Sequence, residues 1–379
     1  MSGGLTAACA TVTGFVGDQA EHWDRAGTLP SDLLRKLGAA GYLCPQVPAG
    51  YGGLGWDSAR DGEFTAHVGS LCSSLRSIMT SQGMAAWTIA RLGSEAQQAD
   101  LLPRLTGGTL AAVAFSEPGA GSDLSAIRTR IVRDRDMLVV DGHKTWSTAV
   151  TYADYVVVVG IMDDGGAGAV VVPTDAPGVR IDRIADPLGC RAAGHADVRL
   201  TRVQVPAAQL LGGGGQFLPL VVTTALAYGR MSVAWGCVGI LRACLAAAGT
   251  HAKSRRQFGR TLGEHQLVAG HLADLMIAEQ TTLRVCEHAS RCWDEGLPDQ
   301  VVATVLAKHV SATAAARAAA VAVQVLASAG TREGHTVARA YRDAKCMEII
   351  EGSNEMCQLL LADHVLANVR PNECIERPS

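Results

Sequence analysis

Hydrophobic positions change their spacing twice along this chain of 379 residues. Up to about residue 110, apolar residues such as Leu33, Leu34 and Leu37 recur at helical spacing between loops. From about 111 to 211 the apolar runs become short, and Gly, Asp and Pro separate them, which predicts strands. After four glycines at 212–215, long runs of helical periodicity return. The pattern predicts three domains in an α+β chain, at 1–110, 111–211 and 216–379.

The middle region has no helical pattern between its short apolar runs. A parallel doubly wound sheet needs alternating helices, so this order favours an antiparallel barrel or sandwich. The chain contains neither a G-x-G-x-x-G fingerprint nor a P-loop. The sequence therefore shows none of the usual signs of a Rossmann nucleotide site. Beyond strand-like residues 110–114, the predicted strands are 137–141, 155–160, 169–173, 196–200 and 203–205.

The last region is predicted to be a helical bundle. Leu267, Leu272, Leu275 and Met276 illustrate its helical spacing. The expected helices are 218–254, 264–295, 298–329, 336–347 and 353–367.

Composition narrows the class of protein. Hydrophobic residues make up 48% and charged residues 18%, which is typical of a globular protein. A net charge of −3 and only 4% aromatic residues argue against nucleic acid as a partner. The first ten residues lack a signal-peptide pattern, and no run of 18 apolar residues occurs; the closest, 312–329, contains Arg317 and Gln324. We therefore expect a cytoplasmic protein without a membrane partner.

The eleven cysteines are scattered, without a CxxC pair or a Cys/His set at metal-ligand spacing. This predicts reduced, buried cysteines and no metal site. Cys237 and Cys244 lie seven residues apart, which predicts a shared buried stripe on one helix.

The most informative segment is Phe115-Ser116-Glu117-Pro118-Gly119-Ala120-Gly121-Ser122-Asp123, directly after an apolar run. Its two glycines permit a sharp turn and a close approach to a ligand. Backbone N–H groups in such a turn form a concavity for an anion, and the Ser116 and Ser122 hydroxyls add donors. Taken alone, the turn could also be an ordinary glycine-rich loop.

Four separated segments, in this order, resemble the signatures of the acyl-CoA dehydrogenase family. They are 115–123, Gly142-His143-Lys144-Thr145-Trp146-Ser147-Thr148, Arg255-Arg256-Gln257-Phe258-Gly259 and Ile350-Glu351-Gly352-Ser353-Asn354-Glu355. The resemblance implies the family's fold, with an N-terminal helical domain, a middle antiparallel β domain and a C-terminal four-helix bundle. It also implies FAD as the cofactor.

The resemblance assigns residues to FAD. The first turn would hold the pyrophosphate and line the flavin, Trp146 would lie against the ring, and the Thr148 hydroxyl would lie near N5. Arg255 would reach across a homodimer or tetramer to the neighbouring pyrophosphate, since its planar fork suits phosphate oxygens. The implied cofactor-binding residues are Phe115, Ser116, Gly121, Ser122, Trp146, Thr148, Arg255, Phe258, Gln324, Ser353 and Glu355.

One of these segments departs from the family pattern. At 324–330, Gln324 and Gly330 agree with it, but Ala327 and Ser328 replace the usual glycine pair. Because those glycines allow close approach to the partner's FAD, the substitutions put that contact in doubt.

Glu351 aligns with the family's catalytic base. Some members take the base from the position before a matching arginine, which here is Arg230, but residue 229 is glycine. As a hypothesis, Glu351 removes the α-proton of an acyl thioester while flavin N5 accepts the β-hydride, and burial raises the pKa of its carboxyl. The substrate-binding residues that the resemblance implies are Ser122, Arg230 and Gly352.

Residues 62–87, 227–246 and 329–358 resemble a narrower group more closely. This group is the acyl-carrier-protein-dependent dehydrogenases of polyketide clusters, above all those of methoxymalonyl (hydroxymalonyl) extender-unit biosynthesis. The resemblance implies a short polar acyl group, such as glyceryl, on the phosphopantetheine arm of an acyl carrier protein. The step would be α,β-dehydrogenation to an enol that collapses to the semialdehyde, or the later oxidation of that aldehyde.

A basic cluster after the first signature is a candidate docking site for an acidic carrier protein. It consists of Arg128, Arg130, Arg133 and Arg135. A solvated β-hairpin is the alternative interpretation of this cluster.

Three other functions stay open. An acyl-CoA dehydrogenase acting on a short-chain acyl-CoA would use the same residues. A flavin monooxygenase on the same fold lacks the Glu base in known relatives, so Glu351 argues against it. A carrier-protein scaffold without FAD would not need Ser122, Trp146, Thr148 and Arg255. The electron acceptor, such as an electron-transfer flavoprotein, is not identified by the sequence.

Overall fold

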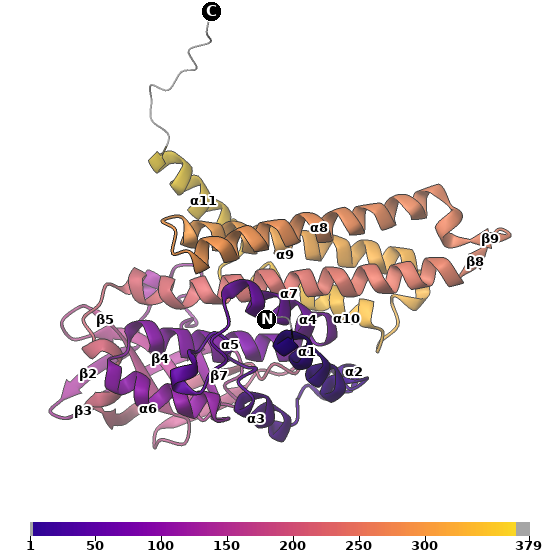
Figure 1. Cartoon of the computed structure of the whole chain (residues 1–379). Helices are drawn as coiled ribbons and strands as arrows, with labels where there is room; N and C mark the ends of the chain where they lie inside the picture. The colour runs from indigo at the N-terminus through magenta and orange to yellow at the C-terminus, as the bar shows by residue number, and fades with distance from the viewer. Residues whose placement is uncertain (1–2, 369–379) are drawn as a thin grey trace, which may run out of the picture.

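The computed structural model describes residues 3–368, so the predicted first and third domains extend beyond the described part at residues 1–2 and 369–379. Helices from both ends of the sequence lie beside a curled sheet, which α5 and α7 contact (Figure 1). The α-helices are α1 (Gly3–Val16), α2 (Ala20–Ala26), α3 (Ser31–Ala39), α4 (Ser58–Leu71), α5 (Ser73–Leu92), α6 (Glu95–Thr106), α7 (Leu218–Ser254), α8 (Gln266–Asp294), α9 (Gln300–Leu326), α10 (Thr336–Met347) and α11 (Asn354–Asn368).

The sheet has seven strands in the order β1-β4-β2-β3-β7-β6, with β5 paired to β4. They are β1 (Ala111–Ala114), β2 (Arg130–Asp134), β3 (Met137–Ser147), β4 (Tyr155–Met162), β5 (Ala167–Pro173), β6 (Val179–Arg183) and β7 (Ala196–Pro206). As predicted, the sheet is mainly antiparallel, although β4 pairs in parallel with β1 and β2. The predicted strands 196–200 and 203–205 are the single strand β7, and neither β2 nor β6 was among the predicted strands.

Between Lys144 and Ser147 the pairing of β3 with β7 shifts register. Trp146, inside this irregularity, has a φ of +55°. A bulge of this kind turns a side chain away from the regular alternation of a strand. The end of β3 is therefore shaped for presenting residues 146–148 rather than for continuing the sheet.

Long helix α7 is the central element of the C-terminal bundle. It packs against α8 and α9 on one side and against α4 and α5 on the other (Figure 1). Cys237 and Cys244 of α7 are both buried in one cluster with α9 and α10, as the shared stripe predicted. Leu218–Ser254 and the stretch Gln300–Ala329 are long and apolar enough to cross a membrane, but 72% and 44% of their apolar windows are buried inside the protein. They are therefore core helices of the bundle.

A common core joins the sheet to the helices. One buried cluster combines residues of α5 and α6 with β1, β4, β5 and the start of α7, including Met84, Ala111, Val157 and Tyr228. Helix α5 lies against both β1 and α7. This places the end of β3, the middle of α7 and the α10–α11 connection around α5.

Candidate active site

The first two signature segments lie side by side. The Thr145 backbone N–H donates a hydrogen bond to the Ser116 carbonyl at 2.8 Å. One residue earlier, Lys144 Nζ donates to the Phe115 carbonyl at 2.9 Å. The turn after β1 is thus attached to the end of β3, although 29 residues separate Phe115 from Lys144.

A buried ion pair holds the turn at residues 115–123 in place. Lys144 Nζ lies 2.8 Å from Glu117 Oε1, and both side chains are almost fully buried. Glu117 also accepts hydrogen bonds from the backbone N–H groups of Arg128 and Thr129 at 2.8 and 2.9 Å. Burial opposes the ionisation of Glu117, but the hydrogen bonds from Lys144, Thr129 and Arg128 outweigh it and lower its pKa to about 2. The pair is ionised at neutral pH and rigidly holds the turn.

The side of the turn that carries Gly119 and Gly121 is open. A Cβ added to Gly119 or Gly121 would meet no atom within 4 Å, and Ser122 is exposed. Ser116 is half-buried at the base of the turn. Free space above exposed backbone, with hydroxyl donors at its edge, fits the phosphate and ribityl oxygens of FAD. The residues that hold the turn therefore fit the cofactor that the sequence predicts.

Trp146 presents its indole next to this turn. It is 56% exposed, which is unusual for so large an apolar side chain in an otherwise well-packed region. Asp197 Oδ1 on β7 accepts hydrogen bonds from Thr145 Oγ1 at 2.6 Å and from the Trp146 backbone N–H at 3.4 Å. An exposed flat ring on a fixed backbone offers a stacking surface for an aromatic ligand such as a flavin.

Thr148 has two partners that the sequence did not predict. Ser81 Oγ on α5 donates to the Thr148 carbonyl at 2.9 Å, and Thr148 Oγ1 lies 3.2 Å from His195 Nδ1. Burial, together with the positive charge of Arg76, lowers the pKa of His195 to about 4. His195 is therefore neutral at neutral pH, and its tautomer decides whether Thr148 donates or accepts. No local pattern indicates these contacts, because they join segments distant in the sequence.

Glu351 lies in the connection between α10 and α11. Its φ is +56° and that of Gly352 is +90°, so the chain reverses sharply here. Arg230 Nε of α7 donates to the Glu351 carbonyl at 3.1 Å. Lys308 Nζ of α9 donates to the Gly352 carbonyl at 2.6 Å. Two buried cations thus fix the backbone of the connection and direct the Glu351 side chain inward.

The Glu351 carboxylate is poorly solvated. Its Oε2 is buried and has no hydrogen-bond partner among residues 3–368. Burial raises its pKa to about 7, although the positive charges of Arg230, Lys308 and Arg76 oppose the shift. A carboxylate with this pKa is a much stronger base than an exposed one and is still half ionised at neutral pH.

Gly229 makes room for this carboxylate. A Cβ on residue 229 would lie 2.4 Å from Glu351 Oε2 and 2.9 Å from Met84 Sδ. Met84 and Ser81 lie three residues apart on α5 and hence on one face of that helix. The same face of α5 therefore contacts the surroundings of Glu351 at Met84 and the Thr148 carbonyl at Ser81. Helix α5 thus connects the surroundings of the predicted base to Thr148 of the second signature.

Arg255 and Phe258 lie elsewhere. They belong to the tip of the arm formed by α7 and α8, which ends in the short hairpin β8 (Arg256–Gln257) and β9 (Arg260–Thr261), far from β2 and β3 (Figure 1). Phe258 is 94% exposed, and Arg255 is exposed as well. Within one chain, the third signature is not brought together with the turn at 115–123.

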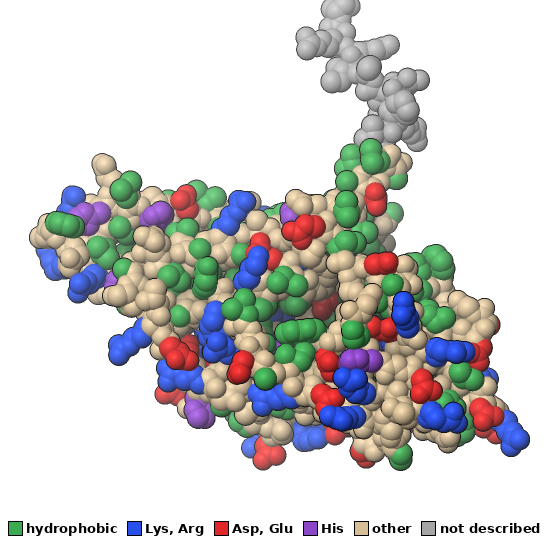
Figure 2. Space-filling view, turned by 180° about the vertical axis from the view of Figure 1, so that it is seen from behind, with side chains coloured by type: hydrophobic (Ala, Val, Ile, Leu, Met, Phe, Trp, Pro, Cys, Tyr) green, Lys and Arg blue, Asp and Glu red, His purple; other side chains and the backbone are tan. Residues whose placement is uncertain are grey.

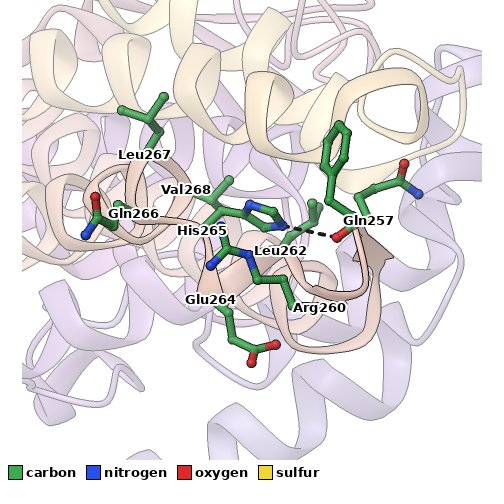
Figure 3. Close-up of a pocket in the computed structure, with 9 residues that line it drawn as sticks. Gln257, Arg260, Leu262, Glu264, His265, Gln266, Leu267 and Val268 are labelled. Carbon is green, nitrogen blue, oxygen red and sulfur yellow. Dashed lines mark hydrogen bonds between the residues drawn. The ribbon is translucent and has the colours of Figure 1, made fainter.

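An open hollow of about 760 Å³ lies at this tip. Its lining includes Phe258, Arg260 and Leu267, and the His265 ring contacts the Gln257 carbonyl at 3.2 Å (Figure 3). A hollow that is open and bordered by exposed apolar side chains is typical of a surface that a second subunit covers.

The other predicted cofactor residues are also at the surface. Gln324 is exposed near the end of α9, and Glu355 is exposed in the first turn of α11. Ser353 is half-buried, and its Oγ accepts a hydrogen bond from the Met356 backbone N–H at 3.3 Å. Of these three, Ser353 and Glu355 adjoin Glu351 in the chain, whereas Gln324 does not.

Three models of the acyl-CoA dehydrogenase family match the chain. They are the N-terminal domain at 6–109, the middle domain at 112–203 and the C-terminal domain at 220–366. The probable acyl-CoA dehydrogenase YngJ of Bacillus subtilis (strain 168) is 33% identical over 93% of this chain and 94% of its own length.

Solved structures agree with the family models. FkbI, for biosynthesis of the methoxymalonyl extender unit of the polyketide immunosuppressant Fk520, is 62% identical, with a TM-score of 0.92 over 95% of this chain and 99% of its own. A glutaryl-CoA dehydrogenase from Mycobacterium smegmatis in complex with FADH2 is 27% identical, with a TM-score of 0.90 over 98% and 97% of the two chains. Together with the fold and the residues around Glu351, these matches establish that the chain belongs to the acyl-CoA dehydrogenase family of FAD-dependent oxidoreductases.

Proposed function

We propose that this protein dehydrogenates the α,β bond of a short polar acyl group carried by an acyl carrier protein, in the formation of a hydroxymalonyl or methoxymalonyl extender unit. The chemistry rests on one observation, the buried Oε2 of Glu351 beside Gly229, which has no hydrogen-bond partner among the described residues. The substrate class rests on the 62% identity with FkbI. The glyceryl group is the acyl group of choice because it is short and carries two hydroxyls.

In the proposed mechanism, Glu351 takes the α-proton on Oε2. Its raised pKa of about 7 matches the task, because the carboxylate must be ionised before the reaction and hold the proton afterwards. Arg230 and Lys308 keep the backbone of the α10–α11 connection in place through its carbonyls. FAD, when bound, supplies the two-electron acceptor for the β-hydride. Gly352 and Ser122, near the base and on the turn respectively, are proposed to contact the substrate.

Within one chain, FAD would be held by the turn and the end of β3. Phe115, Ser116, Gly121 and Ser122 would line the turn, and the Lys144–Glu117 pair would keep it rigid. Trp146 and Thr148 would lie against the flavin ring, with Ser353 and Glu355 following the base. The openness of the turn and the exposure of the indole support this assignment.

A second copy of the chain would complete the site. Arg255 and Phe258 are exposed on the arm, and Gln324 is exposed near the end of α9, so a partner subunit could present them to the FAD of the first. Exposed Leu359, Leu360, Val365 and Leu366 on α11 supply further apolar surface for assembly. We propose a homodimer, or a tetramer built from it, in the cytoplasm, with an electron-transfer flavoprotein as the electron acceptor.

The carrier protein is proposed to dock on the arginines at 128, 130, 133 and 135. All four are exposed on β2 and its flanks, and only Arg130 among them lies within 4.0 Å of a described carboxylate, that of Asp163 at 3.5 Å. Charged side chains of both signs are mixed over much of the surface (Figure 2), so such a local cluster, rather than the net charge, would attract an acidic partner. Charge reversal at these arginines should weaken binding of the carrier protein.

An anaerobic titration tests the function. Purified protein is mixed with glyceryl-carrier protein and, separately, with butyryl-CoA, and the visible absorbance of the flavin is followed. Bleaching with the carrier-bound substrate alone supports the proposal. Bleaching with butyryl-CoA alone would make the protein a short-chain acyl-CoA dehydrogenase, and oxygen consumption during turnover without α,β-dehydrogenation would make it a monooxygenase.

A further inference from the structure

His195 is a half-buried histidine directly before β7, and the proposed mechanism gives it no role. Its Nδ1 lies 3.2 Å from Oγ1 of Thr148, at the end of β3. Among residues 3–368, this is the only hydrogen bond of either side chain, so the second ring nitrogen, Nε2, has no partner there. The imidazole therefore serves the Thr148 hydroxyl and no other described group.

The backbone holds the two side chains in register. The Ala149 N–H donates a hydrogen bond to the Ala193 carbonyl at 2.9 Å, and the Thr151 N–H donates to the Gly194 carbonyl at 3.4 Å. The two segments approach so closely that a Cβ on Gly194 would lie 2.5 Å from Thr151 Oγ1. Since both segments are fixed to each other next to the pair, the imidazole cannot drift away from the hydroxyl.

The surroundings of His195 keep its ring neutral. No described carboxylate oxygen lies within 4.0 Å of either ring nitrogen. Burial and the positive charge of Arg76 both disfavour the imidazolium, and they hold the pKa of His195 at about 4. A neutral imidazole has one N–H donor and one acceptor nitrogen. Depending on its tautomer, Nδ1 can therefore donate to the Thr148 hydroxyl or accept from it.

This property suits the position that Thr148 is proposed to occupy. The centroid of the His195 ring lies 6.0 Å from that of Trp146, the exposed indole proposed to stack on the flavin. Flavin N5 accepts hydrogen bonds in the oxidised state and donates them in the reduced state, so one hydroxyl must serve it in both directions. A hydroxyl has one hydrogen and two acceptor positions, and a neutral imidazole can pair with whichever of them N5 leaves free.

We propose that His195 is a positioning residue that orients the Thr148 hydroxyl toward N5 of the flavin, and that it acts through Thr148 alone. This inference rests on the proposed function, which places Thr148 beside N5. In this account His195 does not touch the substrate and transfers no proton to or from it.

A double-mutant cycle tests the inference on the FAD-loaded protein. The four proteins are wild type, His195→Phe, Thr148→Val and the double variant. Recovery of flavin fluorescence on dilution measures FAD release, and anaerobic bleaching by glyceryl-carrier protein measures the rate of flavin reduction. His195→Phe should weaken FAD binding and slow reduction by about 2- to 10-fold each, the worth of one hydrogen bond. In the Thr148→Val background the same change should alter either quantity by less than about twofold.

Two further variants separate orientation from a structural effect. His195→Asn should recover part of the loss, because its amide offers a donor and an acceptor near the position of Nδ1. His67→Phe is the matched control, since His67 is also half-buried and its Nε2 lies 2.9 Å from Oγ1 of Thr13 among the N-terminal helices. It should change neither FAD release nor the rate of reduction. If His195→Phe does not fold, His195→Ala takes its place in the cycle under the same criteria.

The outcomes distinguish the inference from the proposed function. Equal losses from His195→Phe with and without the Thr148 hydroxyl would show a merely structural role and overturn the inference, as would no loss in either background. If wild-type flavin is not reduced by glyceryl-carrier protein, the proposed function fails, and FAD release alone still decides whether His195 acts through Thr148.

Discussion

The Glu351 carboxylate occupies the space that a side chain on residue 229 would need. A Cβ on Gly229 would stand 2.4 Å from Oε2 of Glu351, far closer than real atoms approach. The α10–α11 connection and the middle of α7 therefore reach the same point from two directions. Only one of the two positions can hold a carboxylate there, and in this chain it is residue 351.

This relationship predicts that a carboxylate at residue 229 can partly replace the one at residue 351. Glu351→Gly should lower the rate of flavin reduction by about 10²-fold or more, the usual contribution of a positioned base. Adding Gly229→Glu to that variant should restore part of the rate, because the new carboxylate enters the space that Glu351 vacates. Stopped-flow absorbance of the flavin measures both rates.

Gly229→Glu in the otherwise unchanged protein is the control for this exchange. The two carboxylates would then compete for one site, so this single variant should be less stable and less active than the double variant. Equal activity of the single and double variants would show that the two positions do not share a site.

The rate of flavin reduction should depend on pH through Glu351. Its pKa is raised to about 7, and only the ionised carboxylate can accept the α-proton. The rate should therefore fall about tenfold per pH unit below 7 and level off above it. In Glu351→Asp the rate should show the same decrease below pH 7 and should be lower at every pH. A flat profile between pH 5.5 and 8 would argue against a base with this pKa.

Breaking the Lys144–Glu117 pair should loosen the turn that faces FAD. Lys144→Met leaves the buried Glu117 carboxylate without its cation, which typically costs about 3–5 kcal/mol. We expect a lower Tm together with weaker retention of FAD on a desalting column. Arg130→Ala, which removes an exposed ion pair with Asp163, is the control and should change stability by less than about 1 kcal/mol. Normal FAD retention by Lys144→Met would show that the turn does not depend on the pair.

Two inactive variants should complement each other if subunits share sites. Arg255→Ala should lose FAD with little change in Tm, because the side chain is exposed. Co-expressed with Glu351→Gln under two different affinity tags, it should give mixed dimers with one intact site of two. Such dimers should recover up to about half of the wild-type activity, because one of their two sites is intact. No recovery would place Arg255 and Glu351 in the site of the same subunit, whereas an active Arg255→Ala variant on its own would place Arg255 outside the site.

Much of the fold could be predicted from periodicity. The helix expected at 218–254 is observed as Leu218–Ser254, because its apolar pattern is long and glycines precede it. Strands β2 and β6 were missed because Arg130–Asp134 and Val179–Arg183 are short segments of mixed polarity without an apolar run. The sequence pattern divided β7 into two predicted strands near Arg202, whose φ is +48°. In the structure this is a local backbone irregularity within one continuous strand.

The site could be predicted only where its residues form local motifs. The signatures named Glu351, Trp146 and Thr148, whose roles stay predictions, but not the contacts that fix them. Ser81 and His195 reach Thr148 from distant segments of the chain. Tertiary packing creates these relationships, and no pattern along the chain carries them.

The most direct test of the account is the anaerobic reduction of bound flavin by glyceryl-carrier protein in wild type and Glu351→Gln. Glutamine keeps the size and polarity of the side chain but cannot take a proton. We predict that the variant retains its yellow FAD and its Tm, while its flavin bleaches about 10²–10⁴ times more slowly. Bleaching of Glu351→Gln at nearly the wild-type rate would contradict the account, because the α-proton would then have another acceptor.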